Sequence, residues 1–315
     1  MISPNEDKPV INHDDTQPFE GLKISDKWKL LENLDNRTTC VQCNKSRKYF
    51  CYTCNIPVEE IKEYVPKVEL PIDIDIIKHP KEIDGKSTAV HGAVLAPDHI
   101  TIYTYPCMPD YPKNGEVILI YPAKTSVSVG EFIRNLSKNQ KPTDHTDTEP
   151  ASKRKFDNSR GSFKKAVFID ATWTQSKRIY KDPRFKNLPC VVLESRITQF
   201  WRSDKNTPRW FLSTIEAVHQ FLIELHKAGL TVDKTTSIVT EKSTDNNRLQ
   251  VSSNEMGAGS EELIDENDTE NEIADEIIEY NGEYDNLLFF FRFMHHKIHT
   301  LYEHDDLLSY KRPLS

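Results

Sequence analysis

Short apolar runs separated by polar turn residues fill much of the chain between residues 72 and 193. Runs of four to six residues that are rich in β-branched and aromatic side chains are typical of buried strands. On this basis the sequence predicts strands at 72–77, 100–105, 117–121, 166–169 and 190–193.

Helical spacing of apolar residues is clearest over Leu212–Lys227, where they recur three and four positions apart. Further helices are predicted at 128–139, at 174–180 and from Tyr284 onward. The segment 287–294 in the last of these is apolar on every side, which predicts burial in its own domain or against a partner. Strands that alternate with helices indicate an α/β fold.

The strand predicted at 166–169 is followed at once by Asp170, Thr172 and Trp173, and then by a helix. Polar groups placed where a strand stops and a helix starts lie at the rim of an α/β sheet, where such folds bind ligands. The same pattern also arises when a carboxylate or hydroxyl simply caps the helix. From the pattern alone both interpretations stand.

Length and local composition divide the 315-residue chain into three parts. Residues 1–37 are predicted to be a disordered tail, 38–56 a cysteine module and 57–315 one domain with low-complexity insertions at 141–165 and 231–275. No apolar stretch approaches the roughly 20 residues of a membrane-spanning helix. The N-terminus also lacks the basic and apolar pattern of a secretory signal. We therefore expect an intracellular protein with no membrane partner.

The net charge of −8 is unevenly distributed. Residues 241–283 hold 14 acidic and two basic residues, a balance of −12, so the rest of the chain carries about +4. A mildly basic folded part is compatible with a nucleic-acid partner but does not demonstrate one.

Four of the six cysteines lie within fifteen residues, as Cys40-x-x-Cys43 and Cys51-x-x-Cys54. Two such pairs in an intracellular chain predict four thiolates around one tetrahedral zinc ion. Because all four ligands come from the protein, the site would be closed and structural. The alternative is a chance cluster of reduced thiols.

Two further groups of polar residues have a functional and a structural interpretation. Ser213 and Glu216 have capping-box spacing, so they predict a helix N-terminus that could also attract an anion. Arg196, Arg202 and Arg209 alternate with aromatic residues, which suits RNA phosphates and bases but also a solvated loop. No P-loop, GxGxxG or GxSxG motif occurs, which argues against the usual NTPase, dinucleotide-binding and hydrolase classes.

The segment Asp170-Ala171-Thr172-Trp173 resembles the Asp-x-Thr-Trp signature of the DTW-domain proteins. Other segments resemble this family in the same order along the chain: 51–54, 76–80, 85–88, 95–97, 102–107, 211–217 and 284–290. Together they cover most of the chain outside the tail and the two insertions.

The resemblance implies a SPOUT-like α/β fold, with helices on both faces of the sheet and a trefoil knot around the cofactor. It also implies a tRNA-uridine aminocarboxypropyltransferase. Such an enzyme transfers the 3-amino-3-carboxypropyl group of S-adenosylmethionine to N3 of a uridine in the tRNA D-loop.

Under this resemblance Asp170, Thr172 and Trp173 are expected to form the catalytic group. Asp170 would accept the N3 proton as a general base or hold the ammonium group of the cofactor. Trp173 would face the sulfonium ion or simply pack against its neighbours.

The remaining site residues are assigned on the same resemblance. The predicted helix N-terminus, with Ser213 and Thr214, is expected to bind the carboxylate of S-adenosylmethionine, and Glu216 is also expected to be a cofactor-binding residue. The adenine side is expected to be lined by Leu119, Tyr121 and Pro122. The tRNA phosphates are expected to meet Arg196, Arg202 and Arg209, and zinc to be held by Cys40, Cys43, Cys51 and Cys54.

Two rival functions remain open at this point. One is an RNA methyltransferase of the same SPOUT-like class, and the other is a non-catalytic RNA-binding adaptor built on the zinc module. The basic cluster Lys153-Arg154-Lys155 favours the nucleus over the cytoplasm. The sequence leaves the oligomeric state open.

Overall fold

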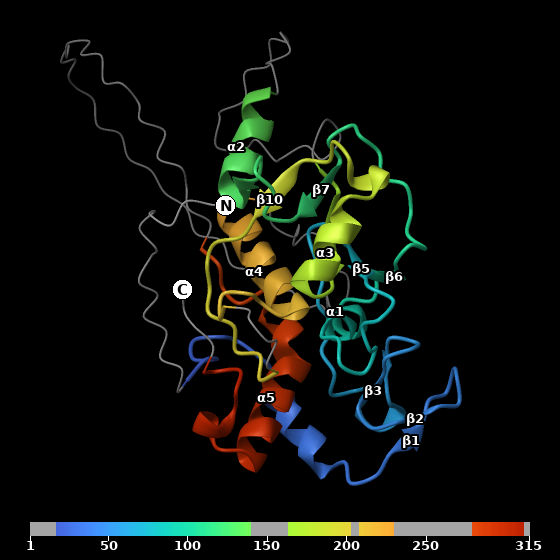
Figure 1. Cartoon of the computed structure of the whole chain (residues 1–315). Coiled ribbons are helices and arrows are strands. Elements are labelled where there is room, and N and C mark those ends of the chain that lie inside the picture. The colour runs from blue at the N-terminus through green and yellow to red at the C-terminus, as the bar shows by residue number, and fades with distance from the viewer. Residues whose placement is uncertain (1–16, 140–162, 203–207, 230–278, 312–315) are drawn as a thin grey trace, which may run out of the picture. The chain divides into compact units, whose positions relative to one another are not determined.

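The structure is a computed structural model that describes residues 17–139, 163–202, 208–229 and 279–311 (Figure 1). Several sequence predictions fall wholly or mostly outside these residues: the first part of the tail (1–16), the insertions at 141–165 and 231–275, and the basic cluster Lys153–Lys155.

Six strands form one parallel sheet in the order β6-β5-β9-β7-β10-β8. Their bounds are β5 Asp73–Lys78, β6 Ile100–Thr104, β7 Val117–Ile120, β8 Val127–Ser128, β9 Lys165–Asp170 and β10 Cys190–Val192. The five strands predicted from the apolar runs are confirmed, and within this sheet only the two-residue β8 is additional. Lys78 lies opposite Asp170 in the register of β5 and β9, so the carboxyl ends of these two strands meet.

Helices pack on both faces of this sheet, and the alternation of side chains along each strand explains why. Ile76 and Phe168 belong to the core beneath α1 (Ala89–Leu95) and α4 (Thr214–Lys227). Ile77 and Val167 point the other way, into the core beneath α3 (Trp173–Tyr180). The 3₁₀ turn η4 (Pro183–Phe185) lies on the same face as α3, where Phe185 joins this core. A parallel sheet covered on both faces accounts for strands that are nearly continuous in apolar residues.

Among the described α-helices, α1 is the one that the sequence did not predict. All seven of its residues are buried, so it lacks the alternation of apolar and polar positions that identifies a surface helix. Gly92 allows the close approach, because a Cβ there would lie 2.9 Å from Ile100 and 3.3 Å from Ile215.

The C-terminal helix α5 (Phe289–Leu301) follows the 3₁₀ turn η6 (Asp285–Leu288) and is buried within this same unit. Phe289, Phe290 and Phe293 have no solvent exposure. This confirms the predicted burial of the all-apolar segment. Among the described helices none is long and apolar enough to cross a membrane.

The expectation of a disordered tail through residue 37 is wrong for residues 17–37. A 3₁₀ helix, η1 (Asp26–Asn33), lies beside α5 (Figure 1), with Trp28 and Leu31 in the core. The amide of Ser25 also donates to Asn286 Oδ1 at 2.8 Å. Three buried apolar residues, Ile24, Trp28 and Leu31, and the hydrogen bonds of two backbone amides anchor a segment whose composition is polar.

Helix α2 (Val129–Asn139) confirms the helix predicted at 128–139. The remaining elements are short: β1 Thr38–Thr39, β2 Ser46–Arg47, β3 Phe50–Cys51, β4 Ile56–Pro57, and the 3₁₀ turns η2 Glu59–Ile61 and η7 His304–Asp306. The four strands form two antiparallel hairpins that frame the cysteine module.

Candidate functional site

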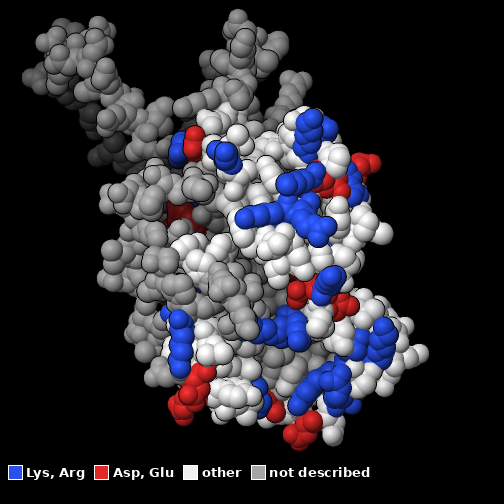
Figure 2. Space-filling model, in the orientation of Figure 1, with Lys and Arg blue, Asp and Glu red and all other residues white. Residues whose placement is uncertain are grey.

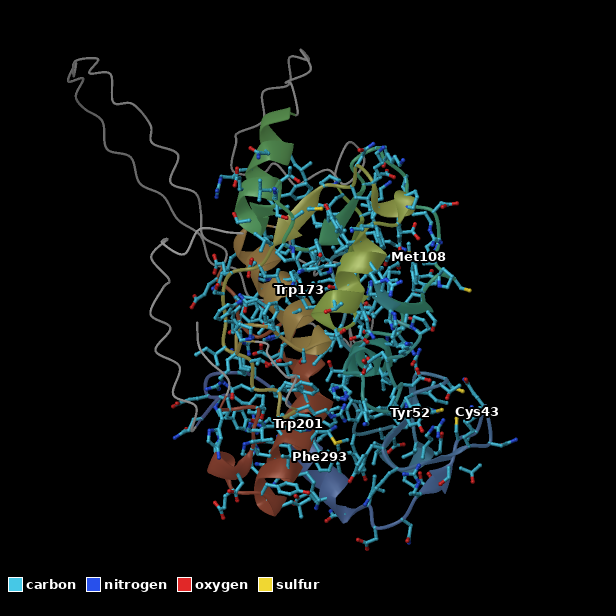
Figure 3. All side chains as sticks on the ribbon, viewed as in Figure 1. Cys43, Tyr52, Met108, Trp173, Trp201 and Phe293 are labelled. Carbon is cyan, nitrogen blue, oxygen red and sulfur yellow. The ribbon has the colours of Figure 1, made fainter. Side chains whose placement is uncertain are left out.

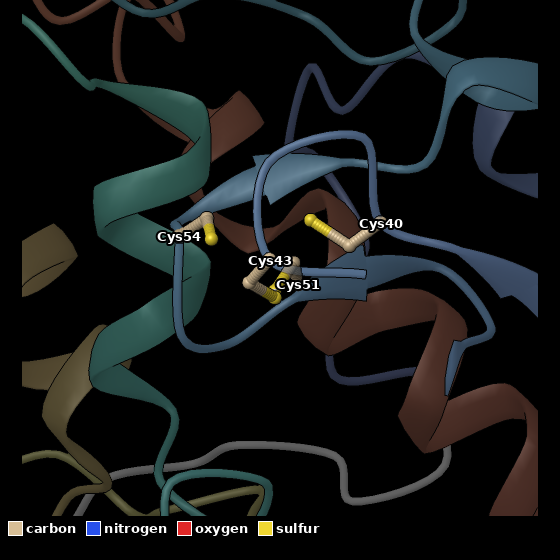
Figure 4. Close-up of side chains that lie close together, drawn as sticks. All are labelled: Cys40, Cys43, Cys51 and Cys54. Atoms are coloured by element: carbon tan, nitrogen blue, oxygen red, sulfur yellow. The ribbon is translucent and has the colours of Figure 1, made fainter. Parts of the chain in front are cut away.

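The four cysteines of the module converge on one point (Figure 4). Their sulfur atoms all lie within 4.8 Å of one another, and the Cys43 and Cys51 sulfurs are 3.5 Å apart. Tetrahedral zinc with Zn–S bonds of about 2.3 Å places sulfur atoms about 3.8 Å apart. The donor set and its spacing therefore fit a four-cysteine metal site.

Each Cys-x-x-Cys pair is the turn of one hairpin, and the two turns have the same backbone design. Asn44 follows the first pair with φ 56°, and its amide donates to the Cys40 carbonyl at 2.9 Å. Asn55 follows the second pair with φ 55° and donates to the Cys51 carbonyl at 2.8 Å. Asparagine tolerates this left-handed conformation better than most residues. The matching turns direct both sulfur pairs toward one position.

Arg47 supports the cluster from its side. Its Nε donates to Cys51 Sγ at 3.3 Å, its Nη2 donates to Thr53 Oγ1 at 2.9 Å, and the guanidinium lies 3.8 Å from the Tyr52 ring. Burial raises the pKa of Cys51, but the hydrogen bonds from Arg47 and from the Thr53 and Cys54 amides outweigh it and lower this pKa to about 6. A thiolate is the form that binds metal.

A pocket of about 420 Å³ lies at the carboxyl ends of the strands. Five segments line it, within 82–88, 120–122, 169–176, 200–202 and 211–214. Trp173, labelled in Figure 3, stands where α3 begins. The volume suits a small molecule, and the carboxyl edge of the sheet is where α/β folds bind ligands.

Asp170 ends β9 and is the buried anion of this pocket, with 8% of its surface exposed. Ser87 Oγ donates to Asp170 Oδ2 at 2.6 Å, and Thr214 Oγ1 donates to Asp170 Oδ1 at 2.5 Å. Burial raises the pKa of Asp170, and the two hydroxyls and the Lys78 charge offset part of that rise. Asp170 therefore does not cap α3.

Glu82 is a second carboxylate of the pocket, and the sequence analysis did not identify it. It is half-buried on the loop after β5. Burial and the nearby Asp170 charge raise its pKa, while Arg202, Lys78 and Lys86 act in the opposite direction. The pocket thus holds both anionic and cationic groups.

Thr172 and Trp173 both line the pocket, and both also have a structural role at the start of α3. Thr172 is the N-cap of α3, and its amide donates to Gln175 Oε1 at 3.1 Å. The Trp173 ring stacks on Tyr121 with centroids 5.7 Å apart and lies 5.5 Å from Phe211. These rings form an aromatic wall, to which Pro122 also belongs.

Two residues predicted to contact a cofactor do not line the pocket. Glu216 is fully buried and accepts hydrogen bonds from the Ser213 amide (2.9 Å), Thr198 Oγ1 (2.6 Å) and the Gln199 amide (2.7 Å). Leu119 is fully buried in the core beneath α3. Neither side chain reaches the pocket, because Glu216 completes the capping box of α4 and Leu119 packs inside the sheet.

Several groups at the N-terminus of α4, the predicted carboxylate site, already have partners within the protein. The Ile215 amide already donates to Thr88 Oγ1 at 3.2 Å, and Ser213 serves the capping box. Moreover, Asp170 is bonded to Thr214 at this helix end. A second carboxylate placed beside Asp170 would be repelled. Ser213 and Thr214 nevertheless line the pocket.

The three arginines predicted to bind RNA lie in three different environments. Arg202 is half-buried in the pocket wall, and its Nη1 donates to the Lys86 carbonyl. Arg196 is half-buried with Nη1 3.4 Å from His219 Nδ1. Arg209 is 5% exposed and lies 5.3 Å from the Tyr310 ring. Arg209 is thus the most deeply buried of the three, whereas Arg196 and Arg202 are half-buried.

Ser87, Thr88 and Glu82 are the main site residues that sequence reasoning missed. All three come from the loop after β5, whose carboxyl end adjoins that of β9. The polar run Lys86-Ser87-Thr88 after a predicted strand was the available signal. Helix α1 begins directly after Thr88. Because it is buried on every side, its sequence has no apolar periodicity that would show where the loop ends.

A larger hollow of about 600 Å³ lies elsewhere, beside α5. Imidazole and aromatic rings dominate its lining, with Phe19, Trp28, His295 and His299 among them. None of the predicted site residues belongs to it, and it is not at the carboxyl edge of the sheet. The pocket around Asp170 is therefore the candidate active site.

Comparison with known proteins gives a consistent result. The DTW domain family matches residues 48–299. A tRNA-uridine aminocarboxypropyltransferase 1 from Xenopus laevis is 37% identical over 295 residues, which cover 88% of this chain and 86% of the relative. The proteins of the same name from Mus musculus and Homo sapiens are each 38% identical over 300 residues, covering 89% of this chain and 84% of the relative. No solved structure shows a significant match. The chain belongs to the DTW-domain family.

Proposed function

We propose that this chain is a tRNA-uridine aminocarboxypropyltransferase that uses S-adenosylmethionine as the donor and N3 of a D-loop uridine as the acceptor. The observation that carries the proposal is the pocket around Asp170. It sits at the ligand-binding edge of the sheet in a chain that shares 37–38% identity with such transferases over most of its length.

The pocket chemistry fits a donor with an aromatic base at one end and a zwitterionic amino acid at the other. Tyr121, Pro122 and Trp173 offer an apolar wall suited to adenine. Arg202 is the pocket guanidinium suited to the carboxylate, and Glu82 suits the ammonium group. This reassigns Arg202 from RNA phosphate to donor, because the guanidinium lies in the pocket wall. When bound, S-adenosylmethionine supplies a carbon activated by its positively charged sulfur.

Asp170 is proposed to accept the uridine N3 proton. Its raised pKa makes it a stronger base than an exposed carboxylate, and its two hydroxyl donors fix its orientation. Reaction at the aminocarboxypropyl carbon instead of the methyl carbon then depends on how firmly the amino-acid end is held. Arg202 and Glu82 would supply that orientation.

Three structural proposals accompany this function. We infer that the cysteine cluster binds a structural zinc ion, which the sulfur spacing supports. We infer a SPOUT-like, knotted arrangement, supported by the family and by the path after β10, which lines the pocket before α4 packs against β9. Residence in the nucleus remains a proposal based on the basic cluster.

Donor labelling tests the function and separates it from its rivals. Purified full-length chain is incubated with unmodified tRNA and with donor labelled either in the carboxyl carbon or in the methyl carbon. We expect only the carboxyl label in tRNA. Methyl label in tRNA would indicate a methyltransferase, and binding without either label would indicate an RNA-binding adaptor.

A further inference from the structure

The exposed face of α3 is strongly basic. Lys177, Arg178 and Lys181 are exposed, and Lys186 is exposed just after η4. Figure 2 shows Lys and Arg side chains gathered over α3. We call these four residues the basic face of α3.

The positive charge of this face is not neutralised locally. Residues 173–189 contain five basic residues and one acid, Asp182. Asp182 is already paired with Arg184, whose Nη2 lies 2.8 Å from its Oδ2. Within the described ranges none of the four residues of the basic face has an ion-pair partner. The face therefore retains its charge for an external anion.

A neighbouring loop adds to the same positive region. The His79 amide donates to the Asp170 carbonyl at 2.9 Å, which places the loop after β5 against the end of β9. Burial lowers the pKa of His79, and the charges of Lys81 and Arg178 lower it further. Both cations therefore act on one position although they come from different segments, and Lys81 is itself exposed.

The basic face begins at the candidate active site. Trp173 lines the pocket, and Lys177 Nζ lies 5.1 Å from the centre of its ring. Lys181, four residues on, is the C-cap of α3, and Lys186 follows η4. Cations thus run from the pocket rim outward along the helix.

We infer that the basic face of α3 binds the sugar–phosphate backbone of the tRNA next to the uridine held in the pocket. The inference rests on the proposed function and adds the surface that holds the substrate. A base that is drawn out of its loop into a pocket brings its flanking phosphates to the pocket rim. Clustered cations at that rim gain affinity by releasing counterions from the RNA.

The test measures tRNA binding by the full chain as a function of salt. For Lys177→Ala/Lys181→Ala we expect roughly tenfold weaker binding at physiological salt, and a log–log salt slope lower by about 1.5. The control Lys27→Ala/Lys67→Ala makes the same charge change at exposed residues of η1, which packs on α5, and of the segment ahead of β5. It should leave the affinity and the slope unchanged.

A second variant excludes an effect through Trp173. Lys181→Ala/Lys186→Ala leaves Lys177 on the Trp173 ring and should still reduce the salt slope, with donor binding by calorimetry unchanged. If the wild-type chain modifies tRNA but both double variants keep its salt slope, the basic face is not the RNA surface. If the wild-type chain transfers no group from the donor, the proposed function fails instead.

Discussion

The cysteine cluster and the Asp170 pocket are built in opposite ways. The cluster is made by fifteen consecutive residues, and two hairpin turns place all four sulfur atoms. The pocket is made by five segments spread between residues 82 and 214, which meet only because parallel strands end at one edge. Spacing along the chain therefore describes the first site, whereas strand register determines the second.

The two sites also differ in their electrostatics. The cluster offers four soft sulfur ligands, which suit one cation. The pocket combines Asp170 and Glu82 with Arg202 and an aromatic wall, which suits a zwitterionic ligand and a proton transfer. We therefore expect the loss of any one cysteine to disable the whole cluster. A single substitution in the pocket should remove only the role of the substituted residue.

Loss of a cysteine ligand should have the largest effect. In Cys40→Ser we expect the bound zinc to be released and the free energy of unfolding to fall by about 4 kcal/mol, because the remaining three ligands cannot close the site. Metal analysis and urea unfolding measure both quantities. Cys107→Ser is the matched control, since Cys107 is exposed and outside the cluster. An unchanged zinc content in Cys40→Ser would refute the metal site.

Removing the pocket anion should abolish transfer without unfolding the chain. We expect Asp170→Asn to lower kcat/KM at least 100-fold, about 3 kcal/mol, because the amide cannot accept the N3 proton. Transfer assays and thermal unfolding measure activity and folding separately. Asp98→Asn, at an exposed residue before β6, should behave like the wild type. Substantial activity in Asp170→Asn would remove Asp170 from the chemistry.

The two hydroxyls on Asp170 should control its ionisation. Both lower the pKa that burial has raised, so Ser87→Ala should raise that pKa further and move the acidic limb of the pH–activity profile upward by about one unit. With a folded-state pKa above the unfolded value, Asp170 stabilises the fold below its unfolded pKa, and this contribution is lost as the pH rises through the folded pKa. Thr214→Val should shift the limb in the same direction. A shift toward lower pH in either variant would contradict this account.

The smallest expected effect tests whether the two regions are independent. Tyr52 lies against Arg47, and a Cβ at Gly85 would be 3.3 Å from the Tyr52 ring, so this ring joins the cysteine module to the loop of Ser87. We expect Tyr52→Ala to lower kcat/KM a few-fold, about 1 kcal/mol, with full zinc content. Tyr52→Phe keeps the ring and should retain activity. Loss of zinc in Tyr52→Ala would place the effect in the cluster instead.

The sequence predicted well those features that depend on neighbours in the chain. The five longer strands, the capping box at Ser213 and the buried segment of α5 all follow from local patterns. Helix α1 was not predicted, because a helix that is buried on every side has no apolar periodicity. The order of the strands also could not be read from the pattern, because a register such as Lys78 opposite Asp170 joins residues far apart.

The site was predictable in part for the same reason. Asp170, Thr172 and Trp173 were marked by a strand end and by a family signature, and they line one pocket. Glu216 and Arg209 were marked equally well by charge, but both are buried: Glu216 accepts hydrogen bonds inside the protein, and Arg209 lies beside the Tyr310 ring. Residue type and spacing do not reveal whether a polar group faces a ligand or its own backbone.

Nucleoside mass spectrometry of one tRNA, treated in parallel with the wild-type chain and with Asp170→Asn in the presence of S-adenosylmethionine, tests the central claim most directly. The account predicts that wild type increases the mass of a single D-loop uridine by one aminocarboxypropyl group and that Asp170→Asn leaves this uridine unmodified. A mass gain of one methyl group, or equal modification by both proteins, would contradict it.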